Sequence, residues 1–530
     1  MPSSEKNKLG RWGATSYFIG SVVGSGIFIT PTSILNRIGS IGLSLLISLL
    51  AAAATTLGAF CYIELGTSIR RSGSDFAYLS YVKWRPLAFM FMVSGSVLIC
   101  PLYSAIQADT FAEYFVQGLG LDSLLMDAAD QHNSAAAFAL RKLIALCSVW
   151  LIIFLNFFSL RSVVAPFQLV TSVAKFLSAL LIIGIGFYWL LFKGYTENLR
   201  QPFANSSFDV GNLTNAFFAG LFNYDGWDVL NYGIEEISNP ASTMPFAILS
   251  GMTCTAIIYT AINFAFFVVL SVCDIRNSSA VAMTFADQTM GYFTKLMPFI
   301  ISLVLLNALN ASVFMGSRYL YAVARERQLP SFIACVHRTH DSPRAALIVH
   351  TVFIVIGLFL GNVNELISYV SFAVWLQRGC AMCALLYIRF KHLPAIRMPI
   401  VLPFLFLAIC FSLSIITIIK DFSTAYVGLT LIGSALIIYG IFIWEKALNR
   451  ISIYREQSSN WNEFCVRIVQ IITDVKMRFF FLLTIALLSV VLLLSPSALA
   501  KKRARRSMPV NAAMPEWKIL SAEVENDGTA

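Results

Sequence analysis

Glycine, serine, asparagine and aspartate interrupt two otherwise apolar segments of the sequence. The first segment reads GSVVGSGIFITP over residues 20–31, and the second reads GLFNYDGWD over residues 220–228. An aspartate at the centre of a membrane helix costs about 2.5–3.5 kcal/mol on insertion scales, and unwound backbone at that depth is tolerated only where it lines a cavity or is buried in protein. We therefore expect both interruptions to face a pocket. The alternative for the first is helix packing, because Gly20 and Gly24 form a small-xxx-small pair.

Helix breaks of this kind suit the recognition of a zwitterion. The half-helix that begins after a break offers free N–H groups to a carboxylate, and we expect Ser25, Gly26 and Ile27 to supply them. The half-helix that ends before a break offers free carbonyls to an ammonium group, and we expect these near Val22 and Phe222. Paired interruptions in two halves of a chain point to the midplane site of a secondary transporter.

A lone lysine lies inside another apolar segment, at Lys175 in the stretch TSVAKF. A lysine within a membrane span is expensive unless it has a partner or meets water. The alternative is that its long side chain reaches a nearby membrane surface.

The composition indicates the elements that must hold these residues. The chain has 530 residues, of which 58% are hydrophobic and 12% charged, against roughly 25% charged in an ordinary soluble domain. This excludes a soluble enzyme and a disordered chain, and the long apolar blocks disfavour an outer-membrane barrel. We expect an all-α membrane protein with twelve spans of about 20 residues or more. The expected spans cover residues 13–34, 41–66, 86–116, 139–159, 163–192, 212–234, 243–271, 292–322, 345–361, 364–388, 400–419 and 423–443.

The distribution of lysine and arginine predicts the orientation. Most of these residues fall in loops that share a side with the N-terminus, which is therefore expected to be cytoplasmic. Asn205 and Asn277 then lie in outward loops as glycosylation acceptors. The net charge of +10 is explained by these loops and does not require nucleic acid. The ten cysteines lie mostly in apolar stretches and are interpreted as small core residues, and no metal site is expected.

The sequence divides into a transporter domain and a tail. We expect a cytoplasmic N-terminus at 1–12, a twelve-helix domain at 13–445 and a cytoplasmic amphipathic segment at 446–478. Residues 479–499 are a further apolar run, long enough to span. If they span, the basic run KKRARR that follows would lie outside the cell, whereas lysine and arginine are enriched on the cytoplasmic side. The sequence therefore leaves it open whether these residues form a thirteenth span. Residues 500–530 are expected to be basic and then disordered.

The motifs together resemble the L-type, glycoprotein-associated (light-chain) amino acid transporters of the amino acid–polyamine–organocation superfamily. The matching motifs are GSVVGSGIFITP at 20–31, CYIELG at 61–66, GW at 226–227, LNY at 230–232, EE at 235–236, NP at 239–240, SR at 317–318, RE at 325–326 and LP at 329–330. The resemblance implies a LeuT-like fold with inverted five-helix repeats at about 13–192 and 212–388, followed by two further helices. It also implies alternating access, with exchange or uptake of amino acids and no cofactor.

The resemblance also implies residue roles. In sodium-independent relatives a lysine at the place of Lys175 occupies the position of a sodium ion and bridges helices 1 and 5, and Phe222 is similar to the gating aromatic that covers the substrate. Asp225 in YDGW resembles the transporters that take cationic and neutral amino acids, and Asp228 in GWD resembles the y+L type. A carboxylate in a pocket of low dielectric attracts a Lys or Arg side chain. We therefore expect neutral and cationic substrates. Alternatively, one aspartate pairs with an internal charge or is protonated, and transport is restricted to neutral amino acids.

Related light chains carry a cysteine between helices 3 and 4 for a disulfide to a single-span glycoprotein. Residues 117–138 contain no cysteine, so a covalent heavy chain is not expected, whereas a noncovalent partner stays open. Three other functions are compatible with a helical membrane protein. The first is a channel, but two broken helices in one chain suit a single occluded binding site better than a continuous pore. The second is a membrane enzyme, which would need catalytic side chains that converge within the spans, and the sequence offers no such set. An amino acid sensor of the same fold stays open.

Overall fold

The computed structural model describes most of the predicted transporter domain. The described residues are 10–24, 26–70, 74–119, 131–157, 165–232, 234, 237–278, 280–325, 328–335, 343–391, 398–443 and 460–467. Ser25 lies outside them. So does most of the tail, and with it the expectations for 446–459 and 468–530, including the apolar run at 479–499.

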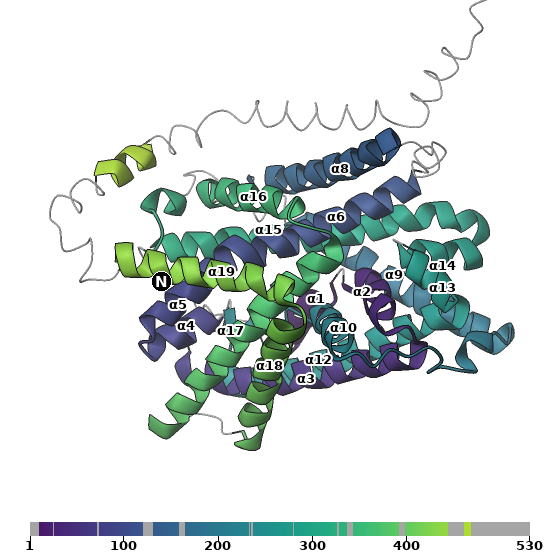
Figure 1. The fold of residues 1–530 in the computed structure, drawn as a ribbon, viewed down its shortest axis with the longest axis horizontal. Helices are drawn as coiled ribbons and strands as arrows, with labels where there is room; N and C mark the ends of the chain where they lie inside the picture. The colour runs from purple at the N-terminus through teal and green to yellow at the C-terminus, as the bar shows by residue number, and fades with distance from the viewer. Residues whose placement is uncertain are drawn as a thin grey trace, which may run out of the picture.

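The first expected span is broken, as its glycines predict. Helix α1 (Arg11–Val22) and helix α2 (Gly26–Ile38) meet at an angle of 46°. Glycine and serine favour such a break, since glycine is the poorest helix former apart from proline. Both halves lie near the centre of the molecule (Figure 1), where α2 packs against α10 and α1 packs against α12.

The sixth expected span is broken as well. Helix α10 (Val210–Asn223) ends where the polar stretch begins, residues 224–228 form turns, and a short helix α11 (Val229–Tyr232) follows. Asp209 caps the start of α10 by accepting a hydrogen bond from the backbone N–H of Asn212 at 2.9 Å.

Long apolar helices surround these two broken elements. They are α3 (Ile41–Ile69), α5 (Arg85–Ser94), α6 (Cys100–Gly118), α8 (Gln131–Phe157), α9 (Ala165–Phe192), α12 (Pro240–Val269), α15 (Met297–Arg325), α16 (Arg344–Leu358), α17 (Val363–Lys391), α18 (Val401–Lys420) and α19 (Phe422–Ile438). A π-helical turn over Gly95–Ile99 joins α5 to α6. Figure 1 shows α6 and α15 on one side of the broken helices, and α3 and α12 on the other.

Nine helices of the described residues are long and apolar enough to cross a membrane, or ten when the α1–α2 pair counts as one. The two remaining expected spans correspond to α16, which is shorter, and to the broken α10–α11 segment. The described residues therefore form a helical, multi-pass membrane protein, and the count of twelve spans stays a prediction.

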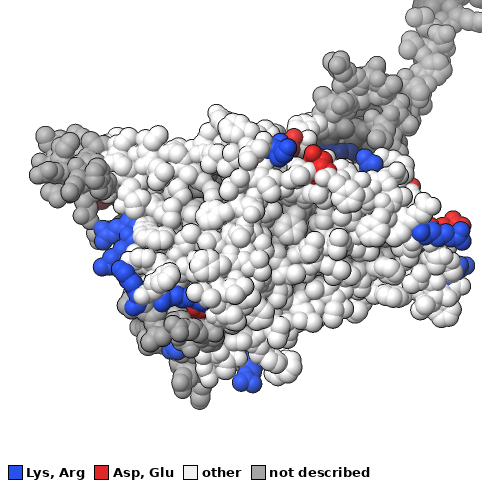
Figure 2. Space-filling view, turned by 60° about the horizontal axis from the view of Figure 1, so that its bottom comes forward, with Lys and Arg blue, Asp and Glu red and all other residues white. Residues whose placement is uncertain are grey.

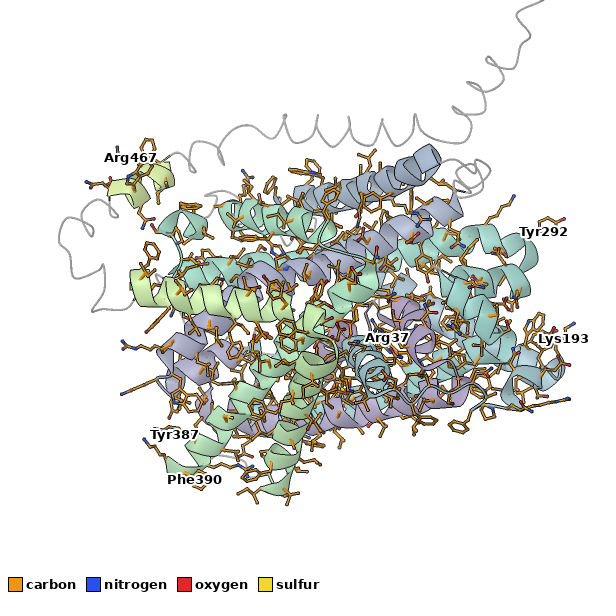
Figure 3. The ribbon with its side chains drawn as sticks, viewed as in Figure 1. Arg37, Lys193, Tyr292, Tyr387, Phe390 and Arg467 are labelled. Carbon is orange, nitrogen blue, oxygen red and sulfur yellow. The ribbon has the colours of Figure 1, made fainter. Side chains whose placement is uncertain are left out.

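The surface agrees with a lipid environment. In the face shown in Figure 2 the charged side chains lie toward the edges, and the broad middle carries none. Figure 3 shows Lys193 and Tyr292 at one end of the molecule, and Tyr387 and Phe390 toward the other. Exposed aromatic residues beside charges are typical of the two membrane–water interfaces.

Three short helices connect the spans and were not expected as separate elements. Helix α4 (Ser74–Tyr81) follows α3 and is largely buried, whereas α13 (Val272–Asn277) and α14 (Val281–Thr289) follow α12. Helix α13 begins with a capping box between Ser271 and Asp274. The burial of α4 carries Asp75, which is 4% exposed, into the interior.

Candidate functional site

The two helix breaks lie against each other, and glycine makes this contact possible. A Cβ atom at Gly26 would lie 2.8 Å from Oδ1 and 2.9 Å from Cα of Asn223. Gly226 has φ +92°, and a Cβ there would lie 2.9 Å from Oγ of Ser21. Only glycine adopts such a φ at little cost and leaves room for the opposing backbone. Each break therefore contains one glycine that touches the other break.

The packing alternative for Gly20 and Gly24 is not what the structure shows. A Cβ at Gly20 would meet nothing within 4 Å, and one at Gly24 would meet only the carbonyl of Val22, at 3.7 Å. These glycines border a cavity and do not make room for a neighbouring helix.

That cavity has a volume of about 190 Å³, which corresponds to about six waters at roughly 30 Å³ each and is enough for a small zwitterion. Its walls come from both breaks and from α4, α6, α9, α15, α17 and the π-helical turn. Six of the predicted site residues line it: Val22, Gly26, Lys175, Phe222, Asp225 and Asp228. Ile27 instead lies in the core, 3% exposed, and is not part of the wall. The substrate contacts of these residues stay predictions.

The backbone at the first break is held by a residue that the sequence analysis missed. The hydroxyl of Tyr259, on α12, donates to the carbonyl of Val22 at 2.7 Å and accepts from the N–H of Gly24 at 3.0 Å. A carbonyl oxygen has two lone pairs, so the Val22 carbonyl keeps one position for an ammonium group.

Lys175 contacts the same half-helix. Its Nζ donates to the carbonyl of Gly20 at 3.2 Å, and the residue is 5% exposed. The side chain therefore connects α9 to the last turn of α1, and it does not extend to a membrane surface as the snorkelling alternative requires. The partial negative charge at the end of a helix favours a cation there.

Asp225 has a partner for each of its carboxylate oxygens. Arg378 on α17 donates from Nη2 to Oδ1 in an ion pair, and the hydroxyl of Tyr103 on α6 donates to Oδ2. The ring of Tyr103 also stacks on Phe222, with centroids 5.3 Å apart and an interplanar angle of 15°. One of the two aspartates thus pairs with an internal charge, the alternative that the sequence analysis left open.

Asp228 is in a different situation. It lines the cavity and is 7% exposed, and it makes no ion pair with any residue that the structure describes. Asp75 also lines the cavity, where its oxygens accept hydrogen bonds from the hydroxyl of Tyr62 and from Nε2 of Gln377. Among the described lining residues, three carboxylates therefore face two cations, Lys175 and Arg378.

Comparisons with known proteins agree with this geometry. The family model described as "Amino acid permease" matches residues 9–444. The chain belongs to this family of amino acid transporters. "Amino acid transporter protein 6" of Caenorhabditis elegans is 45% identical over 90% of both chains. "Asc-type amino acid transporter 1" of Mus musculus is 30% identical over 86% of this chain and 85% of the relative, and the "Cystine/glutamate transporter" of Homo sapiens is 30% identical over 88% and 92%. The resemblance drawn from the motifs is thereby confirmed, and the protein is a transporter, not an enzyme.

Two kinds of residue in this permease site escaped the sequence analysis. Arg378 carried a usable signal, because it is an arginine inside the expected span 364–388. Asp75 and Tyr259 carried none, since Asp75 follows the expected second span and Tyr259 lies in an ordinary apolar run. Their place at the cavity depends on tertiary packing.

Proposed function

We propose that this permease transports L-amino acids by exchange or uptake, without sodium and by alternating access, and accepts neutral and cationic substrates. The observation that carries the proposal is the meeting of the two helix breaks at one cavity. A pair of opposed breaks brings free N–H groups and free carbonyls to the same place. Both charged groups that every amino acid substrate shares then find a partner in one site.

The substrate carboxylate is proposed to bind the backbone N–H groups of Gly26, where α2 begins, and of the adjoining Ile27, together with Ser25, which lies outside the described residues. The ammonium group is proposed to bind carbonyls near Val22 and Phe222. Phe222 lines the cavity and stacks on Tyr103, so a rotation of its ring would open or cover the cavity. This supports the gating role that the resemblance implies.

Sodium independence is supported by the position of Lys175. Its ammonium group lies against the Gly20 carbonyl between α9 and α1, where it supplies a fixed positive charge that a bound sodium ion would otherwise bring. The acceptance of cationic substrates is supported by Asp228, a cavity carboxylate with no ion pair among the described residues.

One observation favours a narrower second candidate, a transporter of neutral amino acids alone. Asp225, one of the two aspartates on which the cationic hypothesis rests, already has Arg378 as its counter-charge. Asp228 alone then decides whether a positive side chain is accepted.

We further propose a plasma-membrane protein with twelve spans, inverted repeats and a cytoplasmic N-terminus. It would work without a covalent heavy chain, because residues 117–138 contain no cysteine. The proposal leaves room for a noncovalent partner.

The test is counterflow in proteoliposomes that contain the purified chain alone. Labelled leucine, lysine, arginine and glutamate are supplied with and without sodium, against unlabelled leucine inside. We expect saturable counterflow of leucine, lysine and arginine that sodium does not change. Excess lysine that fails to compete with leucine would favour the neutral candidate. Binding without counterflow would favour a sensor, and a sodium requirement would contradict the role of Lys175.

A further inference from the structure

Arg378 is a buried cation that the proposed binding of the substrate does not use. It is 3% exposed, and its guanidinium carbon lies 4.6 Å from the ring centroid of Trp227 and 5.2 Å from that of Trp375. Aromatic faces attract cations at such distances. The two rings therefore hold the guanidinium in one place at the wall of the cavity, directly between the second break and α17.

The ion pair of Arg378 removes one carboxylate from the reach of a substrate. Arg378 occupies one oxygen of Asp225 and Tyr103 occupies the other. The side chains of the pair are 4% and 17% exposed, so the two charges are largely shielded from water. A buried charge that loses its counter-charge is strongly unfavourable, so Asp225 depends on Arg378 unless another cation replaces it.

The neighbouring residue on α17 holds a second carboxylate in a different way. Nε2 of Gln377 donates to Asp75 at 2.9 Å. Glutamine is neutral, so this contact orients Asp75 without balancing its charge. Among the described residues that line the cavity, Arg378 forms the ion pair with Asp225 and also interacts electrostatically with Asp75 and Asp228. Lys175 instead contacts the backbone of α1.

We propose that Arg378 is a specificity-determining residue, which sets the charge of the amino acid side chain that the cavity accepts. With Arg378 in place, the charge of Asp225 is balanced, and Asp228 is the aspartate of the second break that meets a substrate. The cavity then accepts neutral side chains as well as cationic ones. Without Arg378, Asp225 becomes an unpaired carboxylate, and a cationic side chain is the substrate that balances it. This inference rests on the proposed transport of amino acids.

The experiment compares initial uptake of labelled lysine, leucine and glutamate in proteoliposomes of the full chain. Charges a few ångströms apart interact strongly at low effective dielectric, so Arg378→Gln should raise the lysine-to-leucine ratio by about tenfold or more. Asp225→Asn leaves Arg378 unpaired, so it should lower that ratio and raise glutamate uptake. The double variant, Arg378→Gln with Asp225→Asn, removes both charges and should return the ratio to about the wild-type value.

A second buried ion pair provides a matched control. Lys142 on α8 and Asp109 on α6 lie 2.7 Å apart, with side chains 11% and 10% exposed, and neither lines the cavity. Lys142→Gln should reduce the yield or thermal stability of the protein, as loss of a buried partner does. It should leave the lysine-to-leucine ratio unchanged.

The outcomes separate specificity from structure. Equal losses of lysine and leucine uptake in Arg378→Gln, or a ratio that Lys142→Gln shifts as much, would overturn the proposal. If Arg378→Gln does not fold, the test uses the wild type, Asp225→Asn and the double variant. An unchanged lysine-to-leucine ratio in Asp225→Asn would then overturn the proposal. A wild-type chain that neither binds nor moves amino acids would instead refute the proposed function, and the inference with it.

Discussion

At the residue scale, the charged residues that line the cavity differ in whether another described group holds them. Lys175 contacts a backbone carbonyl, Asp225 pairs with Arg378, and Asp228 makes no ion pair with a described residue. Placing a charged side chain in the membrane interior is energetically expensive, so such residues usually have a functional role. Their different surroundings therefore predict different effects of mutation.

Lys175→Ala should lower the transport rate by about tenfold or more and leave the protein in the membrane. The change removes the cation that connects α9 to α1 at Gly20. A hydrogen bond from a charged group contributes about 1.5–3 kcal/mol, which corresponds to a loss of tenfold or more in uptake rate. Initial rates are compared at equal surface amounts, measured by biotinylation. Lys193→Ala, at the exposed end beyond α9 (Figure 3), is the control. Normal uptake by Lys175→Ala would refute the role.

The sequence indicated these residues because charge is conspicuous in an apolar segment. It did not indicate their partners. The pairing of Asp225 with Arg378 joins positions that are 153 residues apart in the chain, and the contact of Tyr259 with Val22 joins positions that are 237 apart. Such distances are bridged by the packing of α10 against α17 and of α1 against α12, which no local pattern contains.

At the element scale, the contact between the two breaks depends on Gly26 and not on its neighbour Gly24. A Cβ at Gly26 would overlap the backbone of Asn223, whereas one at Gly24 meets ordinary contact distances. Overpacking of this kind costs about 1–3 kcal/mol. Gly26→Ala should therefore lower the unfolding temperature and reduce transport. Gly24→Ala should leave the unfolding temperature near that of the wild type, because its methyl group clashes with no neighbour.

Thermal unfolding and leucine uptake measure this pair of variants side by side. Gly24→Ala is a matched control because it adds the same methyl group two residues away. Equal effects of the two substitutions would contradict the close approach of the breaks. A loss in Gly24→Ala alone would indicate that the first break needs flexibility more than it needs space.

Most helices could be predicted because membrane spans are long apolar runs. Both breaks could be predicted as well, because the first contains glycine and serine and the second contains glycine, asparagine and aspartate. The expected segment 212–234 corresponds to α10 and α11, and the expected segment 41–66 falls within α3. Helix α4 could not be predicted as a buried element. Its sequence is short and only moderately apolar, and its burial follows from contacts with α5 and α17. Asp75 enters the cavity wall by that route alone.

At the scale of the whole molecule, the proposed orientation places two glycosylation acceptors outside the cell. Asn205 and Asn277 are both exposed, and an acceptor must be accessible on the outer side to be modified. In animal cells, deglycosylation should shift the wild-type band, and Asn205→Gln together with Asn277→Gln should remove the shift. An acceptor introduced near Ser331, on the opposite side, should remain unmodified. Its modification would contradict the orientation.

The carboxylate of Asp228, which makes no ion pair with a described residue, also has an electrical consequence. A transporter that admits lysine at Asp228 and returns leucine moves one net positive charge in each cycle. A membrane potential of 100 mV is worth about 2.3 kcal/mol per elementary charge, or roughly fiftyfold in the ratio of the two directions. A cell with a negative interior would then drive lysine inward at the expense of leucine. The exchange would generate a current, although no ion other than the amino acid crosses.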